Sequence, residues 1–171
     1  MHEERLILGI DPGYGRAGYA VVAEKRGVLH LVACDTIITS QSLAYPKRLQ
    51  QLYEELRTVI TRHSPGEAAI EKLFFGKNAP TAIAVAQARG VTLLALVQNE
   101  IPITEYTPNE VKLAVTGYGL AKKGQVGEMV GLLLNLKEIP RPDDAADAAA
   151  IAICHLHTAH YDKFRVLSGG E

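Results

Sequence analysis

The sequence contains no tryptophan and only two cysteines among its 171 residues. Cys34 and Cys154 stand far apart and match no zinc-binding or redox spacing, which argues against a disulfide scaffold or a zinc-finger fold. We expect both cysteines to be reduced and buried. No apolar run approaches the 18 or so residues of a membrane helix, and residues 1–5 lack a signal-peptide core. These absences predict a cytoplasmic protein.

An excess of positive charge is also missing. The 18 Lys and Arg residues face 19 Asp and Glu residues, which gives a net charge of −1. This balance excludes a protein that wraps nucleic acid by bulk charge, but it leaves room for a local basic face. Hydrophobic residues make up 47% of the chain and charged residues 22%, which is typical of a globular domain.

The order of the predicted elements indicates an α/β fold. Apolar runs predict strands at 6–11, 18–23, 28–36, 67–74 and 101–106, and helical periodicity predicts helices at 43–63, 78–99, 107–117, 122–136 and 143–157. The first three strands are closely spaced, so we expect an antiparallel meander followed by parallel crossovers in a mixed five-stranded sheet. We predict one domain over 1–158 and a flexible tail over 159–171.

Two acidic residues fall inside or at the end of predicted strands. Asp11 ends the run ILGID, and Glu71 lies between Ile70 and Leu73. Burying a lone carboxylate is costly, so either a cation compensates or the strand end is open to water. Two simpler interpretations stay open: Asp11 as a turn residue in Asp-Pro-Gly, and Glu71 as an exposed residue paired with Lys72.

Two further acids open the last predicted helix. Asp144 and Asp147 are three residues apart, so they share a helical face that continues through Ile151. A helix N-terminus accounts for Asp143 as a cap and for Asp144 through the helix dipole. It does not account for Asp147, which alanines flank on the side expected to be buried.

Together the four acids predict a metal site. Asp11, Glu71, Asp144 and Asp147 can converge at one end of the sheet, and hard oxygen ligands favour Mg²⁺ or Mn²⁺ over Zn²⁺. Two such ions about 3.5–4 Å apart can activate water and stabilise the leaving oxygen of a phosphodiester. His155 lies about 12 Å beyond Asp147 along a helix, so we expect it to be structural.

The chain resembles the RuvC family of bacterial Holliday-junction endonucleases, which belongs to the RNase H-like superfamily. Five segments carry the resemblance in order: LGIDPG with GYAVV (8–13 and 18–22), AIEKLFFGKN (69–78), QARGV (87–91), VKLAVTGYGLAKKGQV (111–126) and DAADAAAIAICH (144–155). The match extends from about residue 5 to about residue 158. The second and last segments are more diagnostic than the first, since sugar kinases and actin-like ATPases also begin with an Asp-Gly turn.

The resemblance implies an RNase H-like fold and a catalytic, metal-binding role for Asp11, Glu71, Asp144 and Asp147. Some relatives carry His where this chain has Asp144. It also implies a Mg²⁺-dependent homodimer, with two ions at each active site and Mn²⁺ as a possible substitute. Such a dimer resolves four-way DNA junctions by paired symmetric nicks in recombination and repair. The cleaved DNA would carry 5′-phosphate and 3′-hydroxyl ends. Glu71 or Asp147 would assist proton transfer. The implied partners are RuvA and RuvB, and the implied location is the nucleoid of a bacterial cytoplasm.

Basic residues gather in the middle of the chain. From Lys72 to Lys123 there are six basic and three acidic residues, a local balance of +3. The candidate DNA-binding residues are Lys72, Phe74, Lys77, Arg89, Lys112, Lys122 and Lys123. With the resemblance, Lys112 and Lys123 are the best candidates for phosphate contacts, and Phe74 rather than Phe75 for stacking on bases. A solvated helix face, and core packing of both phenylalanines, remain open interpretations.

Three other functions compete with this interpretation of the sequence. An actin-like or sugar-kinase ATPase would need a second phosphate loop and a second lobe, and 171 residues is short for two lobes. A related nuclease acting on other branched or hybrid nucleic acids stays open. A non-catalytic junction-binding module would gain nothing from four carboxylates facing phosphates.

Overall fold

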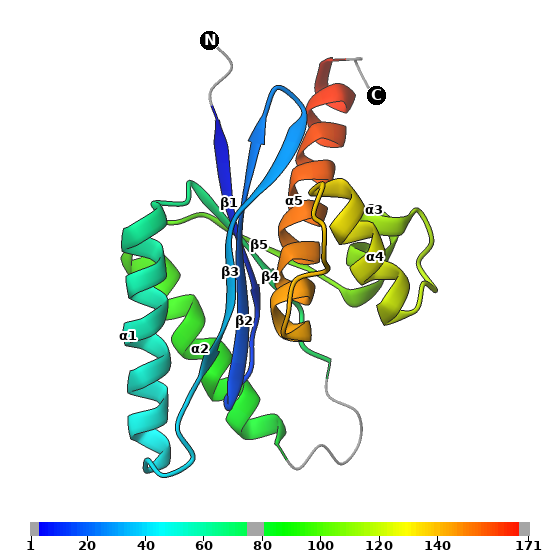
Figure 1. Ribbon diagram of the computed structural model, residues 1–171. Coiled ribbons are helices and arrows are strands. Elements are labelled where there is room, and N and C mark those ends of the chain that lie inside the picture. The colour runs from blue at the N-terminus through cyan, green and yellow to red at the C-terminus, as the bar shows by residue number, and fades with distance from the viewer. Residues whose placement is uncertain (1–3, 75–80, 168–171) are drawn as a thin grey trace.

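A five-stranded mixed sheet forms the centre of the computed structural model, which describes residues 4–74 and 81–167, with side chains described as far as residue 159 (Figure 1). The strand order is β3-β2-β1-β4-β5, in which β1 pairs antiparallel with β2 and parallel with β4. The strands are β1 (Arg5–Asp11), β2 (Arg16–Lys25), β3 (Val28–Ile38), β4 (Glu67–Glu71) and β5 (Ile103–Tyr106). The predicted fold class, three antiparallel strands followed by parallel crossovers, is confirmed.

Helices cover both faces of this sheet. In Figure 1, α1 (Tyr45–His63) and α2 (Ala82–Gln98) lie on one face. The other face carries α3 (Pro108–Thr116), α4 (Lys123–Leu133) and α5 (Asp143–Leu167). Each face has its own apolar core, and both cores reach fully buried residues of β1, such as Ile7 on the α5 side and Leu8 on the α1 side. None of the described helices is long and apolar enough to cross a membrane.

Two glycines let α5 approach the sheet unusually closely. A Cβ at Gly9 in β1 would lie 2.1 Å from the carbonyl oxygen of Ala148, and one at Gly18 in β2 would lie 2.0 Å from that of Asp144. Any larger residue would push the helix away. The N-terminal half of α5 is therefore seated directly on β1 and β2, which places its acidic first turns beside the end of β1.

Several predicted boundaries were wrong. β4 ends at Glu71 rather than at residue 74, and β5 begins at Ile103, because Ile101 is still bonded through its N–H to Leu96 at the end of α2. The last helix continues to Leu167, beyond its predicted end near residue 157 and into the segment predicted as a tail. The predicted start of the second helix, residue 78, lies outside the described residues. The start of α3 agrees with the predicted helix at 107–117, and Thr107 and Glu110 form a capping box there.

Candidate active site

The four predicted acids meet where β1, β4 and α5 come together. Asp11 and Glu71 end two neighbouring parallel strands, whose register pairs Ile10 with Ile70. The carboxyl ends of parallel strands lie at the same edge of a sheet. Asp11 also pairs with Gly18 of β2, and the backbone of Asp144 packs directly against Gly18. Strand register and the close approach of α5 thus bring all four acidic positions to one end of the sheet.

The electrostatics show how tightly the acids are grouped. The pKa of Asp11 rises from 3.8 to about 7, first because the carboxyl is buried and then because Glu71, Asp147 and Asp144 repel its negative charge. Burial also raises the pKa of Glu71, with Asp147 as the next cause. Asp143 is not among the charges that act on Asp11, which favours Asp144 over Asp143 as the third acid of the cluster.

Two cationic side chains touch the cluster. The Lys123 Nζ lies 2.6 Å from Asp147 Oδ2, and its hydrogen bond to Asp147 raises the pKa of the lysine, so the ammonium stays charged. The Arg16 Nη2 lies 3.0 Å from Asp144 Oδ2. Sequence reasoning missed Arg16. The predicted antiparallel pairing of the first two strands could have indicated it, because this pairing brings the start of β2, where Arg16 lies, close to Asp11 at the end of β1.

The donor set suits a hard divalent cation, although the present arrangement does not form a coordination shell. Among the described residues, no three Asp, Glu, His or Cys side chains lie close enough together to hold a metal ion. The ion pairs of Lys123 and Arg16 hold two of the carboxylates instead. A cation would nevertheless favour the ionised forms of Asp11 and Glu71, whose pKa values are raised, and all-oxygen donors fit Mg²⁺ or Mn²⁺.

One group of predicted DNA-binding residues adjoins the acids. Lys112, Lys122 and Lys123 line a cavity of about 480 Å³ together with Glu71 and Asp147. Buried apolar residues of α3, α4 and α5 also line this cavity. Lysines and carboxylates around one cavity can hold a phosphate beside the acidic cluster. These lysines therefore lie where phosphate contacts beside the acidic cluster would require them.

A second group lies apart, around the end of β4 and α2. Lys72, Phe74 and Arg89 line another cavity, of about 380 Å³. The Phe74 side chain is 70% exposed, so core packing does not explain it. Arg89 is paired with Glu105 in β5. The predicted residue Lys77 and the alternative aromatic Phe75 lie outside the described residues.

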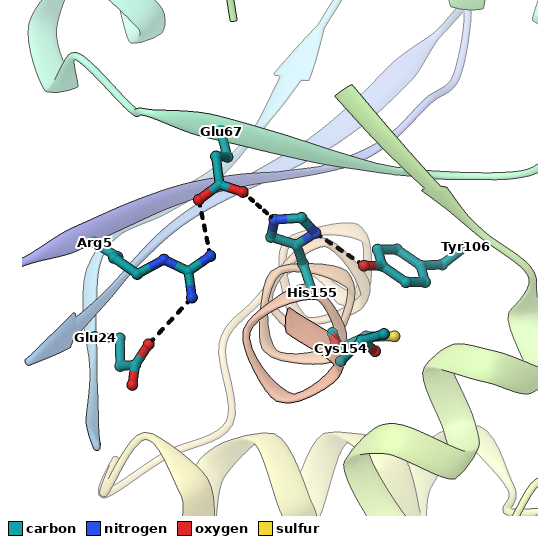
Figure 2. Close-up of polar contacts among 7 residues, drawn as sticks. Arg5, Glu24, Glu67, Tyr106, Cys154 and His155 are labelled. Atoms are coloured by element: carbon teal, nitrogen blue, oxygen red, sulfur yellow. Dashed lines mark hydrogen bonds and ion pairs between the residues drawn. The ribbon is translucent and has the colours of Figure 1, made fainter. Parts of the chain in front are cut away.

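We expected His155 to be structural and the two cysteines to be reduced and buried. His155 is 5% exposed, and its imidazole contacts the Tyr106 hydroxyl and the Glu67 carboxylate (Figure 2). Both cysteines are free, but only Cys154 is buried. Cys34 is half-buried, which corrects the prediction, because β3 is an edge strand.

A mixed sheet of this topology, with acids at the carboxyl ends of its first and fourth strands and at the start of a helix packed across them, defines the RNase H-like class of fold. Comparison with known proteins narrows the class. The family model described as crossover junction endodeoxyribonuclease RuvC matches residues 7–155. The RuvC protein of Roseiflexus sp. (strain RS-1) is 57% identical over 152 residues, which is 89% of this chain and 90% of that protein.

Solved structures of RuvC proteins are also similar to this chain. The structure of RuvC from Thermus thermophilus has a TM-score of 0.85 at 35% identity, covering 92% of this chain and 96% of that one. A structure of the same protein with a Holliday junction substrate has a TM-score of 0.87 at 34% identity, with the same coverage. The chain belongs to the RuvC family of crossover junction endodeoxyribonucleases, and the resemblance inferred from the sequence is confirmed.

Proposed function

We propose that this chain resolves four-way DNA junctions by hydrolysing phosphodiesters at the cluster formed by Asp11, Glu71, Asp144 and Asp147. The observation that carries the proposal is the convergence of these acids in a chain of the RuvC family, where burial and then repulsion by the other three acids raise the pKa of Asp11 to about 7. A binding module would gain nothing from that repulsion. The Holliday-junction complex of a relative supports the choice of substrate.

The four carboxylates would hold two Mg²⁺ ions, with Mn²⁺ as a substitute, and these ions would supply activation of water and stabilisation of the departing 3′ oxygen. The chain's own residues bind and orient the DNA. Lys112, Lys122 and Lys123 face the cavity beside Glu71 and contact the phosphates around the cut. Phe74 stacks on an unpaired base near the junction. The products carry 5′-phosphate and 3′-hydroxyl ends, and Glu71 or Asp147 assists the proton transfer.

Paired symmetric nicks need two active sites, so we propose a homodimer. The exposed face of α2 supports this assembly. Ile83, Leu94 and Val97 are 76%, 52% and 62% exposed and share one side of the helix. Leu94→Lys should shift the mass measured by light scattering from dimer to monomer, whereas Leu132→Lys, at a 72% exposed position on α4, should leave it unchanged.

The wider setting follows from the same proposal. Lys72 and Arg89, together with Lys77 outside the described residues, would guide the arms of the junction, and RuvA and RuvB would deliver it by branch migration. The protein would act in recombination and DNA repair in the bacterial cytoplasm, at the nucleoid.

The test is cleavage of a labelled synthetic four-way junction with Mg²⁺ present or chelated. We expect paired nicks with Mg²⁺, none with chelator, and a loss of about 100-fold or more for Asp11→Asn or Asp144→Asn, with junction binding retained. Glu138→Gln, at an exposed position outside the cluster, is the matched control. Cleavage of linear duplex or RNA–DNA hybrid at the junction rate would favour a different substrate. Cleavage by Asp11→Asn at the wild-type rate would refute the site.

A further inference from the structure

A chain of polar contacts lies between α5 and the sheet and extends from Glu24 and Arg5 through Glu67 and His155 to Tyr106 (Figure 2). The His155 imidazole stands in its middle. Nε2 lies 2.9 Å from Glu67 Oε2, and Nδ1 lies 2.9 Å from the Tyr106 hydroxyl. On the far side of Glu67, Arg5 Nη2 donates to Oε1 at 2.8 Å, and Arg5 Nη1 lies 3.6 Å from Glu24 Oε2. A neutral imidazole satisfies both of its contacts when the tyrosine donates to Nδ1 and Nε2–H donates to the carboxylate.

These contacts join one helix to four consecutive strands. Glu24, Arg5, Glu67 and Tyr106 belong to β2, β1, β4 and β5, which are neighbours in that order in the sheet. Glu24, Tyr106 and His155 are at most 7% exposed. Hydrogen bonds that involve a charged partner in such surroundings are short, directional and costly to break. These polar contacts therefore fix α5 against the sheet at one point along the helix.

Elsewhere, α5 also meets the sheet through the ion pair of Asp144 with Arg16 of β2, but the Arg16 side chain is 53% exposed, so water screens this pair and it holds the helix only weakly. The buried side of the helix consists mainly of alanine and isoleucine, with Ala145, Ala148, Ala149, Ala152 and Ile153 at or near zero exposure. Apolar contacts are non-directional, and small side chains give a smooth surface along which a helix can shift. Gly9 and Gly18 set how closely α5 approaches, but their missing side chains cannot hold it lengthwise.

The lengthwise position of α5 decides the geometry of the acidic cluster. Two of its acids, Asp144 and Asp147, are on the helix, and the other two end β1 and β4. The strand β4, which His155 contacts through Glu67, also carries Glu71 of the site. Glu67 and Glu71 are the two ends of β4, and Tyr106 is the register partner of Glu71. Moving the helix relative to these strands would change the distances between the two acids on α5 and the two acids on the strands.

We infer that His155 is a positioning residue for the active site, which sets the register of α5 against β4 and β5 through Glu67 and Tyr106. It touches neither the DNA nor the proposed metal ions. Its effect reaches the acids through about 12 Å of rigid helix between His155 and Asp147. This inference rests on the proposed metal-binding role of the four acids.

The experiment compares His155→Phe with wild type and with Leu56→Val. The phenylalanine keeps the ring but loses both hydrogen bonds. Leu56 is 1% exposed in the core on the opposite face, so its truncation weakens the fold without touching the polar chain. Each protein is assayed for the Mg²⁺ concentration that gives half-maximal junction cleavage. Mn²⁺ binding without cleavage, followed by electron paramagnetic resonance, and the midpoint of thermal unfolding are measured alongside.

We expect His155→Phe to raise the half-maximal Mg²⁺ concentration and weaken Mn²⁺ binding by about tenfold, because small displacements of ligands have effects of that size. Leu56→Val should lower the unfolding midpoint and leave both metal readouts unchanged. His155→Gln, which can keep one of the two contacts, should recover part of the loss. Equal metal requirements for His155→Phe and wild type, or an equal shift in Leu56→Val, would overturn the inference.

Further variants cover the case in which His155→Phe does not fold and separate this inference from the proposed function. If His155→Phe does not fold, Tyr106→Phe deletes only the hydroxyl that contacts Nδ1, and the same metal shift is expected from it, although smaller. An unchanged metal requirement in a folded Tyr106→Phe would then overturn the inference. The wild-type and Asp11→Asn arms test the proposed site separately. Cleavage by wild type without a divalent ion, or by Asp11→Asn, refutes the metal site whatever His155→Phe does.

Discussion

Replacing Asp11 with asparagine should abolish cleavage and at the same time stabilise the metal-free fold at alkaline pH. The pKa of this carboxyl rises from 3.8 to about 7 through burial and the repulsion of Glu71, Asp147 and Asp144. A change of one in pKa corresponds to about 1.36 kcal/mol, so the ionised carboxylate opposes folding by at most about 4 kcal/mol. Because water reaches part of the site and screens these charges, we expect Asp11→Asn to gain about 1–3 kcal/mol.

The gain should depend on pH in a defined direction. A raised pKa means that the folded chain holds the proton more tightly than the unfolded chain. The penalty for Asp11 is therefore complete above pH 7, shrinks as the pH falls from 7 toward 3.8, and disappears below 3.8. Asparagine carries no charge at any of these values. Asp11→Asn should accordingly stabilise the protein more at pH 8 than at pH 5.

Urea unfolding with chelator, followed by circular dichroism at pH 8 and pH 5, measures this difference. Glu128→Gln, at an exposed position on α4, is the matched control and should change the free energy of unfolding by less than about 0.5 kcal/mol at either pH. The reasoning is wrong if Asp11→Asn is less stable than wild type at pH 8, or if its effect is the same at both pH values. Added Mg²⁺ should stabilise wild type and not the variant.

Three further predictions address the surroundings of the acids. Lys123→Met should lower junction cleavage by about 10- to 100-fold with the fold intact, because the ammonium lies 2.6 Å from Asp147; unchanged single-turnover rates would contradict this. Phe74→Ala should slow cleavage by about tenfold while the unfolding midpoint stays constant, since the ring is 70% exposed; a lowered midpoint would instead indicate core packing. Gly18→Ala should cost about 3 kcal/mol in urea unfolding and also reduce cleavage, because its Cβ would lie 2.0 Å from the Asp144 carbonyl oxygen; wild-type stability would refute the close approach of α5.

The acids of the site could be predicted from the sequence because each of them is unfavourable on local grounds. A carboxylate at the end of an apolar strand, as at Asp11, or amid helical alanines, as at Asp147, needs a reason that local structure does not supply. The fold class followed from the change between strand and helix periodicity. The end of β4 could not be predicted from this periodicity, because Leu73 and Phe74 continue the apolar pattern after the strand ends at Glu71.

Contacts between distant segments were beyond what the sequence could indicate. His155 was expected to be structural, but its partners Glu67 and Tyr106 lie 88 and 49 residues away, and no local signal links them. The ion pair of Arg16 with Asp144 depends in the same way on how α5 rests on β2. Such pairings are set by tertiary packing, whereas periodicity and capping report only on neighbours within a few residues.

The net charge of −1 gains a different meaning once the acids are located. Four of the negative charges stand at one end of the sheet, where Lys123 and Arg16 only partly offset them. Two bound Mg²⁺ ions would contribute +4, so −1 + 4 gives +3, concentrated at the proposed position of the scissile phosphate. Attraction for DNA would then depend on the metal and on a local basic face rather than on bulk charge. A protein built in this way holds plain duplex weakly and salt-sensitively, and it gains affinity only where the shape of the DNA brings phosphates to the acids and lysines together.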